Sequence, residues 1–216
     1  MSIAENLKKL KAEIPSHVKL VAVTKTYPAD VIMHAYDAGY KIFGENRVQE
    51  ITGKYEQLPK DIEWHLIGHL QTNKVKYIAP FVSLIHSVDS LKLLAEINKC
   101  AAKVNRTINC LLQIHIAQEE TKFGLSFEEA ENILAQESSK MKNVCITGLM
   151  GMATLTNNES QIRKEFASLK KCFDSLAIRY SSLTTLSMGM SSDYKIAIEE
   201  GSNMIRVGSA IFGTRG

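Results

Sequence analysis

Eight short apolar runs, rich in β-branched residues, alternate along the chain with segments of helical periodicity. Strands that alternate with helices in this way are typical of βα units built around a parallel sheet. The 216 residues therefore predict an α/β fold, a single (β/α)8 TIM-type barrel near the lower size limit of such barrels. A doubly wound open sheet is the alternative. The predicted strands span residues 18–23, 40–44, 63–68, 82–88, 108–116, 144–150, 183–188 and 204–208.

Helix candidates show apolar residues at three- and four-residue spacing, with charged residues opposite them. Residues 1–14 predict an extra N-terminal amphipathic helix before the first strand, and Pro28 and Ser126 are helix-start signals. No linker rich in Gly, Pro or Ser interrupts the pattern, so we expect residues 1–216 to form one domain. The remaining predicted helices span residues 29–39, 90–104, 126–141 and 159–180.

The charge and cysteine patterns argue against several function classes. The formal net charge is only +3, and lysines alternate with acidic residues, so we expect no nucleic-acid partner. No run approaches the roughly 20 apolar residues that span a bilayer, and no signal peptide is recognisable, so we expect no membrane partner and no secretion. Widely spaced cysteines without a C-x-x-C pair predict no metal site and favour reduced thiols in the cytoplasm.

Each predicted strand has one candidate residue at or after its carboxyl end. Barrel proteins place their functional sites on the face where these ends meet. These residues are Lys25, Asn46, His69, Ser87, Thr121, Met152, Ser191 and Ser209.

Lys25 directly follows the first strand, so its side chain is expected to cross toward the barrel axis. A lysine that forms a Schiff base must be deprotonated part of the time, which partial burial favours. The alternative is a surface lysine that merely follows a strand. Lys122, after the fifth strand, is the other lysine considered for aldehyde attachment.

Two Gly/Ser turns follow the seventh and eighth strands, where barrels frequently bind phosphate. Gly189 and Gly208 permit close backbone approach, while Ser191 and Ser209 add hydroxyl donors to the N–H groups of the turns. Together with Lys25, the turns suggest a phosphate-bearing aldehyde cofactor. The alternative is ordinary turn chemistry without a ligand.

Arg206 lies inside the last strand, on the same side as Gly208 by strand alternation, and is expected to face inward. It either donates a hydrogen bond to the ring nitrogen of a cofactor or pairs with a core carboxylate such as Glu45 or Asp193.

The third predicted strand and the segment after it contain two histidines, which we interpret differently. His65 alternates with Leu66 and is expected to be a hydrogen-bonded core histidine. His69 and residues 71–74 are interpreted as rim residues that handle a second ligand or a partner protein.

Six motifs carry a specific resemblance that covers essentially the whole chain. In order along the chain, AVTKTYP, FGENRVQE, WHLIGHLQTNK, GLMGMAT, SMGMSSD and IRVGSAIFG resemble the YggS/PROSC family of pyridoxal phosphate homeostasis proteins. The resemblance implies a barrel of the alanine racemase N-terminal domain type and pyridoxal 5′-phosphate (PLP) as cofactor. It further implies that Lys25 is the Schiff-base lysine and Arg206 contacts the pyridine nitrogen. The phosphate would be bound by Gly208, Ser209 and Ser191, with Asn46 as a further contact.

The resemblance implies a protein that holds PLP and contributes to vitamin B6 and amino-acid and keto-acid homeostasis, with apo-enzymes as possible cofactor acceptors. Racemases use a second acid/base from an additional domain, and the resemblance ends at Gly216, so we expect a monomer without turnover and no established catalytic residue beyond Lys25, if any. The alternative is a small monomeric PLP-dependent amino-acid racemase, with Tyr27, His69 or water as second base. A third interpretation is a phosphate-binding barrel enzyme unrelated to PLP.

Overall fold

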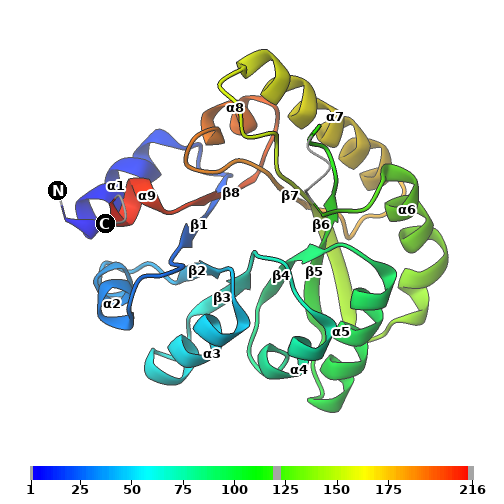
Figure 1. Ribbon diagram of the computed structural model, residues 1–216, viewed down its shortest axis with the longest axis horizontal. Coiled ribbons are helices and arrows are strands. Elements are labelled where there is room, and N and C mark those ends of the chain that lie inside the picture. Colours follow the sequence, from blue (N-terminus) through cyan, green and yellow to red (C-terminus); the bar gives the residue numbers. More distant parts are fainter. Residues whose placement is uncertain (1, 119–122, 214–216) are drawn as a thin grey trace.

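The computed structural model describes residues 2–118 and 123–213 and shows a closed barrel of parallel strands surrounded by helices (Figure 1). All the predicted strands form, in the predicted order. Their bounds are β1 (Lys19–Val23), β2 (Ile42–Glu45), β3 (Glu63–Leu66), β4 (Leu84–Val88), β5 (Ile108–Ile114), β6 (Val144–Gly151), β7 (Thr185–Ser187) and β8 (Met204–Val207).

The pairing of β1 with β8 closes the barrel and excludes the open sheet. β1 also pairs in parallel with β2, so it has a neighbour on each side. The register places Val21 beside Arg206 and Ala22 beside Val207. The closure therefore brings the carboxyl end of β1, where Lys25 follows, next to the turn that follows β8.

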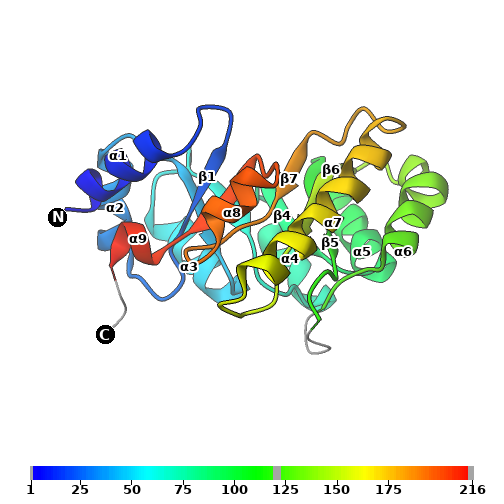
Figure 2. The ribbon, with the colours of Figure 1, turned by 90° about the horizontal axis from the view of Figure 1, so that it is seen from above.

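Helices connect the strands around the outside of the barrel (Figures 1 and 2). The α-helices are α1 (Ile3–Glu13), α2 (Ala29–Asp37), α3 (Val48–Gln57), α4 (Val75–Ile78), α5 (Leu91–Lys103), α6 (Phe127–Asn132), α7 (Glu159–Ala177), α8 (Tyr194–Glu199) and α9 (Ser209–Phe212). No helix of the described residues is long and apolar enough to cross a membrane.

The segment predicted as one helix over residues 126–141 is helical from Phe127 to Lys140, but the helix changes type in its second half. α6 starts as predicted with a capping box, in which Ser126 and Glu129 bond each other's backbone N–H groups. It then passes into a π-helical turn, η2 (Ile133–Glu137), and a 3-10 turn, η3 (Ser138–Lys140). The Ser138 hydroxyl donates to the Leu134 carbonyl at 2.7 Å, a competing bond of the kind that bends helices.

The extra N-terminal helix is confirmed and lies beside the last helix of the chain (Figures 1 and 2). Ser2 caps α1. The apolar face of this helix is buried at Leu7 and Leu10. The Asn6 side-chain amide donates to the Ile211 carbonyl of α9 at 2.9 Å. α1 therefore supports α9, the short helix that begins at Ser209.

The barrel interior contains an apolar layer that is separate from the larger core between strands and helices. Its residues come from five strands: Val21, Leu84, Leu111, Met150 and Met204. Since such layers fill the inside of small barrels, space for a ligand remains toward the carboxyl ends of the strands.

Candidate cofactor-binding site

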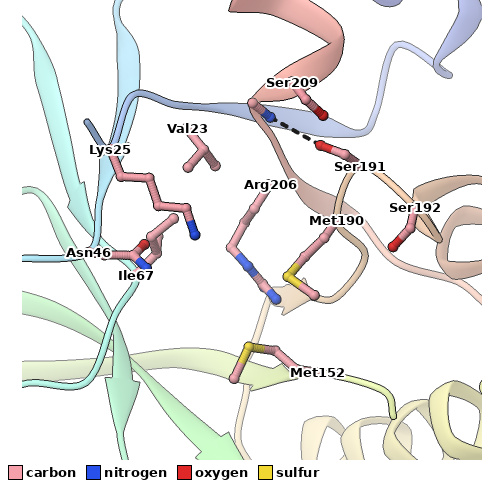
Figure 3. Close-up of a pocket in the computed structure, with 11 residues that line it drawn as sticks. Val23, Lys25, Asn46, Ile67, Met152, Met190, Ser191, Ser192, Arg206 and Ser209 are labelled. Carbon is pink, nitrogen blue, oxygen red and sulfur yellow. Dashed lines mark hydrogen bonds between the residues drawn. The ribbon is translucent and has the colours of Figure 1, made fainter. Parts of the chain in front are cut away.

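A cavity of about 310 Å³ lies at the carboxyl end of the barrel (Figure 3). The structure brings all six predicted cofactor-binding residues to this one cavity. Its lining comprises Val23, Lys25, Asn46, Ile67, Met152, Met190, Ser191, Ser192, Arg206, Gly208 and Ser209. The apolar walls and few convergent polar groups are typical of small-molecule sites.

Lys25 is half-buried and extends its side chain into the cavity on the side of Asn46, with Arg206 facing it (Figure 3). The peptide groups on both sides of it are held by side chains of α3. The Thr24 carbonyl accepts from Lys54 Nζ at 2.9 Å, and the Thr26 N–H donates to Glu50 Oε2 at 2.8 Å. Thr26 has a left-handed φ of 70°, a conformation that needs such support.

A buried ion pair lies beneath Lys25. Lys54 Nζ is 2.6 Å from Glu45 Oε1, which also accepts the Thr24 hydroxyl at 2.6 Å. Burial raises the pKa of Glu45, although the adjacent Lys54 charge opposes this. The second oxygen, Glu45 Oε2, has no hydrogen-bond partner among the described residues. The sequence did not identify this pair, because the burial of Ile51 and Lys54 on one face of α3 becomes visible only in the structure.

The two Gly/Ser turns contact each other directly. The Gly208 N–H donates to Ser191 Oγ at 3.3 Å, the bond drawn in Figure 3. Gly189 has a φ of 98° and no room for a side chain, because a Cβ would lie 2.6 Å from that of Ala197. At Gly208, a Cβ would lie 2.9 Å from the Val23 carbonyl oxygen of β1. Both glycines are therefore required by packing within the barrel itself.

Arg206 is buried, and its hydrogen bonds go to neutral oxygens. Nη1 donates to the Ser187 hydroxyl at 2.6 Å and to the Ser187 carbonyl at 3.0 Å, and Nη2 donates to the Gly151 carbonyl at 3.2 Å. Burial lowers the pKa of Arg206 to about 10, although the negative charge of Asp193 acts in the opposite direction and raises it. Of the two carboxylates considered as partners of Arg206, Glu45 is excluded because it pairs with Lys54, whereas the charge of Asp193 does act on Arg206 and raises its pKa.

A chain of buried side chains runs away from Arg206 through the barrel interior. Ser187 Oγ lies 3.1 Å from His86 Nδ1, and His86 Nε2 lies 3.1 Å from His65 Nδ1. The prediction of a hydrogen-bonded core histidine at position 65 is confirmed. Burial lowers the pKa of His65 to about 3, and burial beside His65 and Arg206 lowers the pKa of His86 well below its usual value. Both rings are therefore neutral near pH 7.

Other predicted residues lie elsewhere. His69 is outside the cavity, with Nδ1 3.0 Å from Asp89 Oδ2 and its ring stacked on Phe123. Ser87 does not follow a strand but lies within β4, where its hydroxyl donates to the Gly68 carbonyl at 2.6 Å. Thr121 and Lys122 lie outside the described residues.

Three residues of the cavity lining were not predicted from the sequence, namely Val23, Ile67 and Ser192. Val23 and Ile67 each lie close to the end of a predicted strand, a position that could have identified them. Ser192 directly follows Ser191 in the turn after β7, a position that could have identified it.

Fold and cavity define a class: a (β/α)8 barrel protein with an amine after β1, a buried guanidinium in β8, and serine hydroxyls at the last two turns. The model of the alanine racemase N-terminal domain family matches residues 1–216. A pyridoxal phosphate homeostasis protein of Aquifex aeolicus is 44% identical over 201 residues, covering 91% of this chain and 87% of that protein. The chain therefore belongs to the alanine racemase N-terminal domain family and, within it, to the pyridoxal phosphate homeostasis proteins.

Solved structures agree with this assignment. PipY of Synechococcus elongatus with PLP bound is 38% identical, with a TM-score of 0.90 over 98% of this chain and 100% of its own. An alanine racemase of Clostridium difficile, 15% identical, shares the fold with a TM-score of 0.81 over 99% of this chain and 56% of its own.

Proposed function

We propose that this protein binds PLP as a Schiff base on Lys25 and takes part in vitamin B6 and amino-acid and keto-acid homeostasis. The observation that carries the proposal is the convergence of Lys25, Arg206 and the paired Gly/Ser turns on one cavity of about 310 Å³. The PLP-bound structure of PipY supports the choice of ligand.

The lining residues fit this cofactor. Bound PLP supplies an aldehyde carbon that condenses reversibly with amines. Lys25 provides the amine, and Ser191, Gly208 and Ser209 hold the phosphate where the last two turns meet. Arg206 donates to the pyridine nitrogen, and Asn46 contacts the ligand from the β2 side. A pKa of about 10 keeps Arg206 protonated near pH 7, so that it cannot accept a proton from the nitrogen.

The cavity favours holding the cofactor over racemising a substrate. Besides the Lys25 amine, the described lining residues include no carboxylate, histidine or tyrosine that could serve as a second base. The Tyr27 hydroxyl donates to the Gly213 carbonyl at 2.7 Å, outside the lining, and His69 is bonded to Asp89. The two side chains considered as second base are therefore engaged elsewhere, which disfavours the racemase alternative.

The cellular role follows from reversible attachment. A Schiff base at the barrel mouth can form and be released without any further reaction, so the protein is suited to buffering PLP and supplying it to apo-enzymes. We propose that residues 1–216 act as one PLP-binding domain and as a monomer. Its four cysteines are unpaired, which is consistent with a reducing compartment such as the cytoplasm.

The test is an absorption titration of the protein with PLP. Wild type and Lys74→Ala should develop a Schiff-base band, while Lys25→Ala should not, because its amine is gone. The thermal midpoint of Lys25→Ala should stay close to that of wild type, since the side chain extends into a cavity. An unchanged band in Lys25→Ala would contradict the assignment. Rapid deuterium exchange at the α-carbon of alanine, lost in Lys25→Ala, would favour the racemase instead.

A further inference from the structure

The chain of polar side chains behind Arg206 is not used by the proposed cofactor site. It runs from Arg206 in β8 to Ser187 in β7, His86 in β4 and His65 in β3. Because β4 and β7 are not neighbours in the barrel, the 3.1 Å contact between Ser187 Oγ and His86 Nδ1 crosses the barrel interior. All four residues are buried. Buried polar groups need hydrogen-bond partners, so the positions of the protons in this chain can be derived.

The direction of the first two hydrogen bonds follows from the guanidinium. Arg206 has only donors, so Ser187 Oγ must accept from Nη1 at 2.6 Å. The hydroxyl proton of Ser187 is then left for a second partner, and His86 Nδ1 is the acceptor that the described residues offer it. If Nδ1 carried a proton instead, the Ser187 hydroxyl would be a buried donor without an acceptor, which is costly. Ser187 therefore donates to His86 Nδ1.

The tautomers of both histidines follow from this bond. His86 accepts at Nδ1, so as a neutral ring it carries its proton on Nε2, which lies 3.1 Å from His65 Nδ1. His65 therefore accepts at Nδ1 and carries its own proton on Nε2. Burial lowers the pKa of both rings, which agrees with neutral rings near pH 7. The chain thus has one direction, and every bond in it donates away from Arg206.

This direction affects how Arg206 is held at the cavity wall. Because His86 takes up its proton, the Ser187 hydroxyl presents a lone pair to the guanidinium. The charge of Arg206 in turn polarises the hydroxyl and strengthens its bond to His86, as expected in a continuous hydrogen-bonded chain. Without the imidazole, the hydroxyl would rotate toward another acceptor. The shorter of the two Nη1 bonds would then weaken, while the bond to the Ser187 carbonyl at 3.0 Å would stay.

We propose that His86 is a positioning residue for the cofactor, which orients the Arg206 guanidinium through the Ser187 hydroxyl. This inference rests on the proposed function, in which Arg206 donates to the pyridine nitrogen. His65 acts one step further away, because its Nδ1 accepts the Nε2 proton of His86 and so selects the tautomer whose Nδ1 can accept. The arginine of β8 is thereby oriented from β3 and β4, on the opposite side of the barrel.

The first test needs no cofactor. Long-range proton–nitrogen correlation NMR of the apo-protein distinguishes a protonated from an unprotonated ring nitrogen. In wild type, His86 and His65 should both carry the proton on Nε2, with signals assigned by their loss in His86→Asn and His65→Asn. A proton on Nδ1 of His86 would reverse the chain and overturn the inference.

The second test measures PLP affinity by fluorescence titration. His86→Leu removes the acceptor of the Ser187 proton and should weaken PLP binding about fivefold, comparable with the loss of one neutral hydrogen bond. His86→Asn should stay within about twofold of wild type, because the asparagine Oδ1 replaces the imidazole Nδ1 as acceptor. Leu111→Ala, in the apolar layer inside the barrel, is the control for loosened packing and should leave PLP affinity unchanged.

A double-mutant cycle separates positioning from packing. In a Ser187→Ala background, His86→Leu should cause no further loss of PLP affinity, because the hydroxyl that links it to Arg206 is already absent. A further loss in that background would overturn the positioning role. Equal affinities of wild type and His86→Leu, or an asparagine variant as weak as the leucine variant, would do the same. Absence of any Schiff base in wild type would instead overturn the proposed function, while the apo-protein would still show whether the chain has the derived direction.

Discussion

Lys54 and Arg206 are both buried cations of the barrel, yet they are held by opposite kinds of partner. Lys54 lies against the Glu45 carboxylate at 2.6 Å, with Glu50 at 3.6 Å. Arg206 is held by the Ser187 hydroxyl and by backbone carbonyls. One charge is neutralised within the protein, and the other is oriented by neutral groups at the wall of a cavity.

The difference separates a structural cation from a ligand-binding one. The Lys54 ion pair fixes the Thr24 carbonyl and thus the end of β1 from which Lys25 extends. Arg206 is held in a fixed position by neutral groups at the wall of the cavity, where its guanidinium suits a hydrogen-bond acceptor such as a pyridine nitrogen. We therefore expect changes at Lys54 to act mainly on stability and changes at Arg206 to act mainly on ligand affinity.

Lys54→Met gives the largest expected effect on stability. It leaves Glu45 as a buried carboxylate without its counter-ion, which costs about 3–5 kcal/mol. Urea unfolding should show this loss, and the Glu45→Gln/Lys54→Met double variant should recover much of it. Burial holds the pKa of Glu45 above its value in the unfolded chain. Lys54→Met should therefore lose stability as the pH rises through the folded-state pKa and Glu45 becomes ionised. A loss below 1 kcal/mol at pH 8 would show that the ion pair is not structural.

Arg206→Gln should act chiefly on the cofactor. Loss of one hydrogen bond from a charged donor is worth about 1.5–3 kcal/mol, or about 10–100-fold in PLP affinity. Stability should fall less than in Lys54→Met, because a glutamine amide can still reach neutral acceptors. Fluorescence titration measures the affinity, with Arg163→Gln, a half-exposed arginine on α7, as control. Equal PLP affinities in wild type and Arg206→Gln would remove the arginine from the site.

The histidine chain behind Arg206 predicts a pH dependence. The His65 pKa is lowered to about 3, so below pH 6.5 the unfolded state binds a proton that the native state does not. Stability is therefore full above about pH 6.5 and is lost as pH falls, by about 1.4 kcal/mol per pH unit for each such histidine. Urea unfolding between pH 7 and 5.5 should show this slope, and His65→Gln should reduce it. An unchanged slope would mean that His65 takes up its proton in the native state.

Ser187→Ala should give the smallest effect. Its hydroxyl joins Arg206 to His86, and removing one neutral partner costs about 1 kcal/mol. PLP affinity should fall a few-fold, because the guanidinium keeps its bonds to the carbonyls of Ser187 and Gly151. Ser175→Ala, on the exposed face of α7, should change nothing. A loss as large as that of Arg206→Gln would show that the hydroxyl alone positions the arginine.

The barrel was predictable because each strand carries its own signal. The apolar runs that form β1 and β8 can be recognised without knowing which strands they pair with. The number and order of all eight runs therefore predicted the topology. Helix interruptions were less predictable, as η2 and η3 show, because the Ser138 hydroxyl bond to Leu134 arises only once the helix has formed.

The site residues that follow strand ends could be predicted from the sequence. The residues that lie outside the cavity and hold the site residues in place could not. Lys25 and Ser209 follow strands that lie next to each other, so the topology alone brings them together. Lys54 and His86 reach their partners across 9 and 101 residues of sequence, respectively, and no local pattern names Glu45 or Ser187 as those partners.

The most direct test of the account is borohydride reduction of the PLP complex followed by peptide mapping. The reduced cofactor should be attached to Lys25, at one equivalent per chain, and Lys25→Ala should acquire no label. Label on another lysine, with Lys25 unmodified, would contradict the assignment of the β1 amine and with it the proposed role of the cavity.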